Sequence, residues 1–379
     1  MLMGLAPAAD FPRLRDITYL NSASVSVVPQ PVVAEVEAFH RQIGSQGTLS
    51  FGDEEEARVY DGARGEIAAM IHARPEDVAL MSSATECIGQ IAWWLRPGKG
   101  KNVVSADIEF PSVTYPWLQV AKATGGEVRL ARALERPEDF SLEAIARLVD
   151  KNTAAISISH VQYATGHRLD PVVLADLAHA HGALLVLDVT QSAGVIPIDV
   201  RAAHFDVVLG SSYKWMCGPF CSAFCYLHPD IWRDYEPPFA GWHSTNVVYH
   251  FDATRIDLAA SARRMEYSTV SYGAGLGLAA AARYLQGIGM ERIHRHDLDL
   301  ARQLMDGLEK LGATLITPRA EEQRAAIVCA RFPKPAHEIA AALREKQIHC
   351  APRLGALRIS PHFFNTQEHI AQCLAAIAS

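Results

Sequence analysis

The chain lacks the features of a secreted, membrane-spanning or nucleic-acid-binding protein. No uninterrupted apolar run reaches the ~18 residues that suggest a membrane span. Residues 1–10 lack the basic flank and the longer apolar stretch of a signal peptide. The formal net charge of −7 disfavours a general binder of nucleic acid or of anionic membranes. We therefore expect neither a nucleic-acid nor a membrane partner.

Cysteine is sparse. The 379 residues include 7 cysteines, an odd and scattered set, whereas disulfide frameworks belong chiefly to short secreted chains. We expect reduced thiols and a cytoplasmic location. Cys217, Cys221 and Cys225 recur at every fourth position. Gly218-Pro219 would break a helix that placed them on one face, and a strand would space them far apart. We interpret them as buried small residues and expect no metal.

The composition is that of an ordinary globular protein, with 49% hydrophobic and 20% charged residues. At roughly 150 residues per domain, the length predicts two domains, or one large and one small. No glycine-rich phosphate fingerprint follows an early strand, which disfavours a nucleotide-binding α/β protein.

Short apolar runs alternate with helical stretches from about Thr18 to Trp242, as in repeated strand–helix units. Continuous apolar strands between helices indicate a mostly parallel sheet that is buried on both faces. Such sheets bind ligands at the carboxyl ends of their strands. The expected strands are 78–81, 102–105, 154–159, 183–187, 206–209 and 224–227, and the expected helices are 86–95 and 169–181.

After Trp242 the pattern changes to a loop-rich passage that runs to Tyr272. We predict an α/β fold with a large domain at 17–245 and a smaller α+β domain formed by 1–16 and 246–379, with a boundary helix around 274–300. The expected later elements are helices 274–284 and 291–311, strand 326–332, helix 336–346, strand 357–360 and helix 366–377.

Lys214 directly follows a stretch that has the pattern of a buried strand. Lysines are usually solvated surface charges. In partly apolar surroundings a lysine loses its proton more easily and becomes a nucleophile that can form a Schiff base with a carbonyl. Asp188 ends the neighbouring predicted strand, and an electron-sink cofactor needs such a carboxylate to keep a ring nitrogen protonated. The pair suggests pyridoxal 5′-phosphate (PLP).

Segment 82–86 lies between a predicted strand and a predicted helix. Free backbone N–H groups at a helix N-terminus, together with small hydroxyl residues, form a phosphate site. Taken alone, the segment is better explained by an ordinary helix cap with Ser83 or Thr85 at the N-cap position. Ser211, which precedes Lys214 by three positions, allows the same two interpretations. The phosphate interpretation is favoured when these groups are considered together with Lys214, because all of them are expected at the edge of the sheet where such proteins bind their ligand.

These residues resemble a known family, the PLP-dependent enzymes of fold type I in aminotransferase class V. That group includes cysteine desulfurases, selenocysteine lyases, kynureninases and isopenicillin N epimerase-like proteins. The resemblance covers nearly the whole chain, from 19–24 to 357–366, and is most specific around Lys214. It implies a fold type I architecture with a mostly parallel sheet of the seven-stranded type. It also implies a homodimer with shared active sites.

The resemblance implies a role for individual residues. Lys214 matches the Schiff-base lysine that moves protons at the substrate α-carbon, and Asp188 matches the carboxylate at the pyridine nitrogen. Arg358 matches the arginine that binds the substrate carboxylate, although a surface ion pair would explain it in isolation. The other implied cofactor contacts are Gln191 near the phenolic oxygen, Ala84, Thr85 and Ser211 at the phosphate, and Thr269 at a phosphate in the other subunit.

Phe110 departs from the pattern of the family. Many members stack a histidine over the cofactor ring, and the desulfurases use it in acid–base steps. A phenyl ring can stack there but cannot move protons. At this position the chain resembles the kynureninase-like and epimerase-like members.

Two tyrosines are further departures. Tyr163 stands where many relatives carry asparagine, and its phenol could donate to the cofactor oxygen or act as an acid toward the substrate. Tyr213 stands where histidine is common, and it could still reach the phosphate. Partly buried tyrosines bonded to nearby backbone are the alternative interpretation of both.

Cys350 bears on the reaction. Desulfurases need a cysteine on a mobile loop, somewhat further before the C-terminal arginine. Cys350 precedes Arg358 by only eight positions, in a segment that is typical of the start of a strand. We interpret it as a structural thiol.

The sequence thus predicts a PLP-dependent enzyme that acts on an amino acid through a Schiff base and an α-carbanion. The favoured reaction is the lyase cleavage of the C–S bond of a cysteine derivative by β-elimination. An aminotransferase or an isopenicillin N epimerase-like epimerase would use the same atoms and remains an alternative. A cysteine desulfurase or a PLP-binding protein with little turnover is less favoured.

Overall fold

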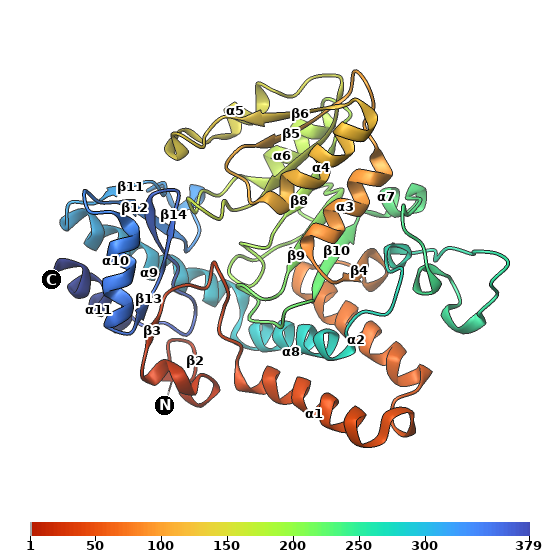
Figure 1. Ribbon diagram of the computed structural model, residues 1–379, viewed down its shortest axis with the longest axis horizontal. Helices are drawn as coiled ribbons and strands as arrows, with labels where there is room; N and C mark the ends of the chain where they lie inside the picture. Colours follow the sequence, from red (N-terminus) through yellow and green to blue (C-terminus); the bar gives the residue numbers. More distant parts are fainter. Residues whose placement is uncertain (1) are drawn as a thin grey trace.

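The computed structural model describes residues 2–379, and its centre is a seven-stranded sheet in the order β4-β10-β9-β8-β7-β5-β6 (Figure 1). Only β10 runs antiparallel to its neighbours, β4 and β9. The remaining pairs are parallel. The strands are β4 (Val78–Met81), β5 (Asn102–Ala106), β6 (Glu127–Ala131), β7 (Thr153–Ser159), β8 (Leu184–Asp188), β9 (Val207–Ser211) and β10 (Ala223–Leu227).

Helices cover both faces of this sheet, so its inner strands β8, β9 and β10 are buried and mostly apolar. Along β8, Leu185 and Leu187 pack into one core, while Val186 packs into the core on the opposite face. Helices α3 and α4 contribute to the second core, and α2, α6 and α8 contribute to the first. The helices of this part are α1 (Gln30–Gln46), α2 (Asp53–Ile71), α3 (Ala84–Leu95), α4 (Pro111–Thr124), α5 (Leu142–Ala146), α6 (Pro171–His179), α7 (Pro229–Asp234) and α8 (Tyr272–Ile288).

A smaller α+β part follows, drawn in blue in Figure 1. Its sheet is antiparallel in the order β11-β12-β15-β14 and packs on α9, α10 and α11 through a separate core. The elements are α9 (Met290–Lys310), β11 (Thr314–Leu315), β12 (Val328–Arg331), α10 (Ala336–Glu345), β13 (Ile348–His349), β14 (Ala351–Arg353), β15 (Ala356–Ile359) and α11 (Gln367–Ala378).

The N-terminal residues lie against this smaller part (Figure 1). Strands β1 (Leu2–Met3) and β2 (Ala6–Pro7) form a short hairpin, and β3 (Thr18–Tyr19) pairs in parallel with β13. The Leu5 N–H also donates to the Phe363 carbonyl at 2.8 Å. Ala6, Phe11 and Leu14 also pack into the first core of the large part. The assignment of 1–16 to the smaller domain stays a prediction.

The predicted fold class is confirmed, and so is every strand and helix that the sequence predicted, within a few residues at each end. The longer elements that the sequence did not predict are α1, α2, α4 and β6. The short elements α5, α7, β1, β2, β3, β11, β13 and β14 were not predicted either. Within residues 2–379, no helix has both the length and the apolarity needed to cross a membrane.

Gly194 allows the loop of Lys214 to pack closely against the end of β8. Its φ is +99°, and a Cβ there would lie 2.3 Å from the Trp215 carbonyl oxygen. Gly194→Ala should therefore lower the free energy of unfolding by more than ~2 kcal/mol, the upper cost of a left-handed backbone alone. Gly182 is the control, since its φ is +71° but no atom lies within 4 Å of the added Cβ. We expect Gly182→Ala to cost ~1 kcal/mol in urea denaturation. Equal costs would contradict this role of Gly194.

Candidate active site

Polar side chains gather at the carboxyl edge of the central sheet. Asp188 is the last residue of β8, Ser211 the last of β9 and Ser159 the last of β7. Ser159 and Asp188 are direct neighbours in the register of the sheet. Lys214 follows Ser211 by three positions and begins a tight turn, in which the Cys217 N–H donates to the Lys214 carbonyl at 2.8 Å. The sheet thus brings together the groups that the sequence placed at strand ends.

Lys214 is buried, with only 7% of its surface exposed. Its Nζ lies 5.4 Å from the centre of the Phe110 ring and 5.7 Å from that of Tyr213. Burial lowers the pKa of Lys214 to about 8, although the Asp188 carboxylate opposes the shift. At pH 7 roughly a tenth of Lys214 is therefore neutral and nucleophilic, a far larger fraction than for an ordinary lysine with a pKa of about 10.4.

The pKa of Lys214 predicts how the apoenzyme takes up PLP. Only the neutral amine attacks an aldehyde, so the rate of covalent uptake should rise with pH and reach half its maximum near pH 8. An ordinary lysine would place that midpoint at about 10.4. Stopped-flow absorbance of the apoenzyme mixed with PLP across pH measures it. A midpoint at the ordinary lysine value would show that burial does not activate Lys214.

The Asp188 carboxylate is held in place by a backbone hydrogen bond and can interact with a cation. Its Oδ1 accepts a hydrogen bond of 2.7 Å from the Thr190 N–H. Burial raises the pKa of Asp188, while the Thr190 hydrogen bonds and the Lys214 charge oppose this shift. A protonated ring nitrogen beside the carboxylate would favour its ionised form further. Asp188 therefore fits the cofactor nitrogen.

The N-terminus of α3 meets the end of β9. The Ala84 N–H donates to Ser211 Oγ at 3.1 Å, and the Glu86 N–H donates to Ser83 Oγ at 3.2 Å. Ser83 is thus the N-cap residue that the alternative interpretation expected. The cap does not exclude a phosphate site, because the first turn of a helix has more N–H groups than one cap satisfies. Thr85 and Ser211 lie where a phosphate would meet these groups.

Arg358 lies in the same region and is almost completely buried. Its Nη1 donates to the Tyr163 carbonyl at 2.8 Å, and its Nη2 donates to Ser24 Oγ. Arg353 Nη2 donates to the same Ser24 Oγ at 3.3 Å. Within residues 2–379 neither guanidinium forms an ion pair, so the surface-ion-pair interpretation of Arg358 is wrong.

Arg358 carries the signature of a site for an anion. Its Nε is buried and has no hydrogen-bond partner among the described residues. Burial and the neighbouring Arg353 lower its pKa to about 10. A buried cation without a counter-ion is costly, and a carboxylate that bonds two of its N–H groups would relieve that cost.

Aromatic rings surround the amine of Lys214. Phe110 and Tyr163 pack edge to face, with ring centres 5.5 Å apart, and burial raises the pKa of Tyr163. Tyr213 stacks on Phe220 at 4.9 Å. Gln191 is fixed between the Ala23 carbonyl, 3.0 Å from its Nε2, and the Trp215 indole, 2.7 Å from its Oε1.

Thr269 lies in the segment between η8 (Ala262–Met265) and α8. It is exposed and lines a hollow together with Ser82, Glu86 and Cys221. Its proposed contact with a phosphate in the other subunit stays a prediction. Cys221 is exposed, so the expectation that Cys217, Cys221 and Cys225 are all buried is wrong for this residue. It lies in the turn before β10, where its φ is +58°.

Sequence reasoning missed three residues of the site: Ser24, Arg353 and Glu109. The Glu109 carboxylate is buried and accepts from the Ser159 N–H at 2.9 Å and from the Gln162 amide. Burial raises its pKa to about 7. It joins the loop of Phe110 to the end of β7. An acidic residue shortly after the predicted strand 102–105, directly before Phe110, was the available signal.

A profile of the aminotransferase class-V family matches residues 18–372. The chain belongs to this family. It is 27% identical to an uncharacterized aminotransferase of Bacillus subtilis, over 97% of this chain and 96% of that protein. It is 30% identical to a probable cysteine desulfurase of Methanothermobacter thermautotrophicus, over 80% of this chain and 76% of that protein.

Solved structures share the fold of this class-V chain. A cysteine desulfurase from Thermococcus onnurineus superposes with a TM-score of 0.88 at 23% identity, covering 98% of this chain and 96% of that one. The cystine C–S lyase C-DES, in complex with cysteine persulfide, superposes with a TM-score of 0.89 at 21% identity, covering 97% and 99%. The chain is therefore a PLP-dependent fold type I enzyme.

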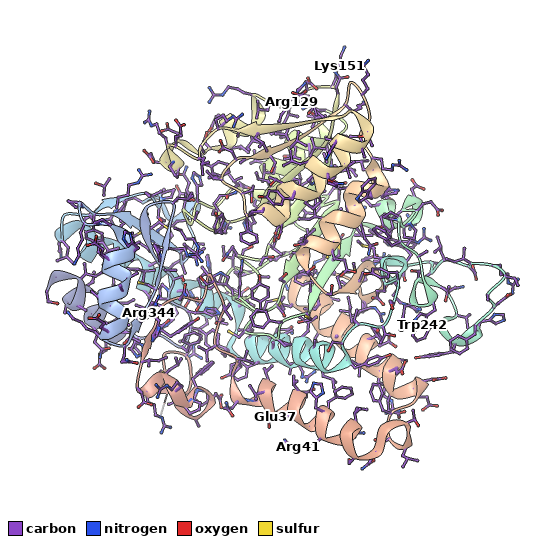
Figure 2. The ribbon with its side chains drawn as sticks, viewed as in Figure 1. Glu37, Arg41, Arg129, Lys151, Trp242 and Arg344 are labelled. Atoms are coloured by element: carbon purple, nitrogen blue, oxygen red, sulfur yellow. The ribbon has the colours of Figure 1, made fainter. Side chains whose placement is uncertain are left out.

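The residues of this class-V site fit PLP. Lys214 offers a buried amine with a lowered pKa, and Asp188 a buried carboxylate at the neighbouring strand end. The N-terminus of α3 with Ser211 offers hydrogen-bond donors to a phosphate. A separate hollow of about 960 Å³ is lined only by residues between 241 and 257. Figure 2 labels Trp242 there, on the segment that extends from the sheet.

Proposed function

We propose that this enzyme is a C–S lyase that eliminates a thiol from the β-carbon of a cysteine derivative. With one water, the reaction yields pyruvate, ammonium and the free thiol. The observation that carries the proposal is the state of Cys350, which is only 8% exposed and lies between β13 and β14. Burial raises its pKa to about 12. Such a thiol cannot accept sulfur from a substrate as a desulfurase requires.

The residues around Lys214 can carry the steps of an elimination. PLP, when bound, supplies an electron sink for negative charge at the substrate α-carbon. Arg358 orients the substrate by its carboxylate. The neutral Lys214 amine removes the α-proton as a general base. The thiolate that leaves the β-carbon then needs a proton.

Tyr163 is our candidate for the acid that protonates the leaving sulfur. Burial raises its pKa, so its hydroxyl stays protonated at neutral pH. It packs against Phe110, which lies near Lys214 Nζ and has no proton to donate. The alternative role for the same phenol is that of a hydrogen-bond donor to the cofactor oxygen. Tyr163 therefore takes the place of the missing histidine in this proposal.

Relatives support a reaction at sulfur. The solved structure of the cystine C–S lyase C-DES shares the fold, and several relatives are probable cysteine desulfurases. The aminotransferase name of the Bacillus subtilis relative favours transamination as the second candidate. An amino-acid epimerase would also use Lys214 at the α-carbon.

A product assay separates these reactions. The holoenzyme is incubated with cystine, S-alkyl cysteines and ordinary L-amino acids. We expect pyruvate and thiol in equal amounts from the cysteine derivatives. If the product is instead a keto acid that retains the substrate side chain, and PLP is converted to its amine form, the enzyme is an aminotransferase and not a lyase. If the only change is loss of the optical purity of the substrate, the enzyme is an epimerase.

Two variants distinguish a lyase from a desulfurase in the same assay. Cys350→Ser should leave the rate within about twofold, because a buried structural thiol takes no part in elimination. Tyr163→Phe should slow thiol release by roughly 10²-fold, within the range of a lost general acid, while the absorption of bound PLP is kept. Loss of activity in Cys350→Ser with retained PLP would instead indicate a desulfurase.

The assembly and location belong to the same proposal. A homodimer would bring Thr269, which is exposed, to the phosphate of its partner's site. All seven cysteines are unpaired in the structure, which supports a reducing compartment such as the cytoplasm. Light scattering at micromolar concentration tests the dimer, and a monomer with full activity would contradict it.

A further inference from the structure

Histidine and aspartate side chains gather at the amino edge of the central sheet, opposite the candidate active site. His179 ends α6, His204 lies in the turn before β9, and Asp206 immediately precedes β9. His228 and Asp230 come next to them, at the end of β10 and in α7. None of these residues takes part in the chemistry described above.

We propose that His179, His204 and Asp206 form a binding site for a divalent transition-metal ion, with zinc as the best match. His179 Nε2 lies 2.8 Å from Asp206 Oδ2, and His204 Nε2 lies 3.4 Å from Asp206 Oδ1. One ligand atom from each residue falls within 4.8 Å of the others. In a tetrahedral zinc site, with bonds of about 2.0–2.1 Å, ligand atoms lie about 3.3 Å apart. Small rotations of these side chains would therefore bring the three ligand atoms to the spacing of a zinc site.

The carboxylate of this site is already fixed. Asp206 is only 2% exposed, and its Oδ2 also accepts the Leu185 N–H at 2.8 Å. A ligand whose orientation is held by a backbone bond loses little freedom when an ion binds. The imidazoles are open to solvent by contrast, with 34% of the His179 side chain and 44% of the His204 side chain exposed. The ion has an entry path, and water can fill the fourth position.

His228 lies next to this site and, with Asp230, forms a second group of possible ligands around His204. Its Nδ1 accepts the Asp230 N–H at 3.3 Å as the N-cap of α7, which occupies that nitrogen. Its ring lies against the His204 ring, with centres 3.8 Å apart. His228 therefore orients His204 toward Asp206.

The donor set selects the class of ion. Two imidazoles and one carboxylate suit zinc, nickel or copper, whereas magnesium and calcium prefer oxygen ligands. An ion bound here would tie the end of α6 to the start of β9. Because Asp188 and Ser211 lie at the opposite ends of β8 and β9, the ion would stabilise the fold and take no part in turnover.

Calorimetric titration of the untagged holoenzyme with zinc chloride tests the site. The Cys221→Ser background removes the exposed thiol, which could also bind zinc. We expect one ion per chain, and His204→Ala should weaken its binding by at least ~10-fold. His337→Ala is the matched control, because His337 is exposed on α10, away from the cluster.

Thermal unfolding supplies a second readout. Zinc should raise the melting temperature of the parent protein and of His337→Ala, but not that of His204→Ala. Magnesium should have no effect on any of them. If His204→Ala folds poorly, the same measurements are made on His179→Gln, which keeps a polar side chain. Equal zinc affinity in the His204 and His337 variants, or no binding of one ion per chain, would overturn the proposal.

Discussion

Alanine in place of Lys214 is expected to lower turnover by at least ~10³-fold, because the variant loses both a covalent attachment point and a general base. Lys214 is buried between the aromatic rings of Phe110 and Tyr213, and no second lysine lies in the described site. The variant should still bind PLP without a covalent bond, since Asp188 and the N-terminus of α3 remain. Steady-state kinetics and equilibrium dialysis of PLP measure the two effects.

Lys151→Ala is the control for this experiment. Figure 2 labels Lys151 on the outer edge of the molecule, and its side chain is exposed. Its replacement should leave turnover and PLP binding unchanged. A Lys214→Ala variant that turns over at the rate of the control would remove Lys214 from the mechanism.

Arg358→Gln is expected to lower kcat/KM for a cysteine derivative by roughly 10²-fold or more. Removing one partner of a buried, hydrogen-bonded charge pair costs about 2–5 kcal/mol. The guanidinium is 1% exposed and has no ion-pair partner in residues 2–379, so its free N–H group is available to the substrate carboxylate. Most of the effect should fall on KM, because the carboxylate is held before and during the reaction.

A substrate without a carboxylate distinguishes binding from folding. The corresponding amine should be a poor substrate for the parent enzyme and should lose little further activity in Arg358→Gln. Arg344→Gln is the matched control, since Arg344, labelled in Figure 2, is exposed on α10 and is not among the residues of the described site. An unchanged KM for the cysteine derivative in Arg358→Gln would show that the arginine does not bind the carboxylate.

The central sheet was predictable because its strands are buried on both faces. Their continuous apolar runs, such as 184–187, are separated by helices and end at polar residues. Helices α1 and α2 were missed because they pack largely on α8, and charged residues dilute their apolar pattern. The antiparallel direction of β10 depends on pairing with β4 and β9, which no local pattern encodes.

The site was predictable where its residues lie at strand ends. Lys214 and Asp188 could be placed together because parallel strands end at one edge of the sheet. The partners of Arg358 could not, since Ser24 is separated from it by 334 positions in the sequence. For Tyr163 the sequence predicted a role for the side chain, whereas its carbonyl also accepts a hydrogen bond from Arg358.

Covalent attachment of PLP to Lys214 is the central feature of the proposed mechanism. Borohydride reduction of the holoenzyme, followed by proteolysis and mass spectrometry of the peptides, tests it most directly. We expect loss of the visible absorption band and one reduced pyridoxyl phosphate group on the peptide that contains Lys214. A colourless protein that binds no PLP, or a label on another lysine, would contradict it.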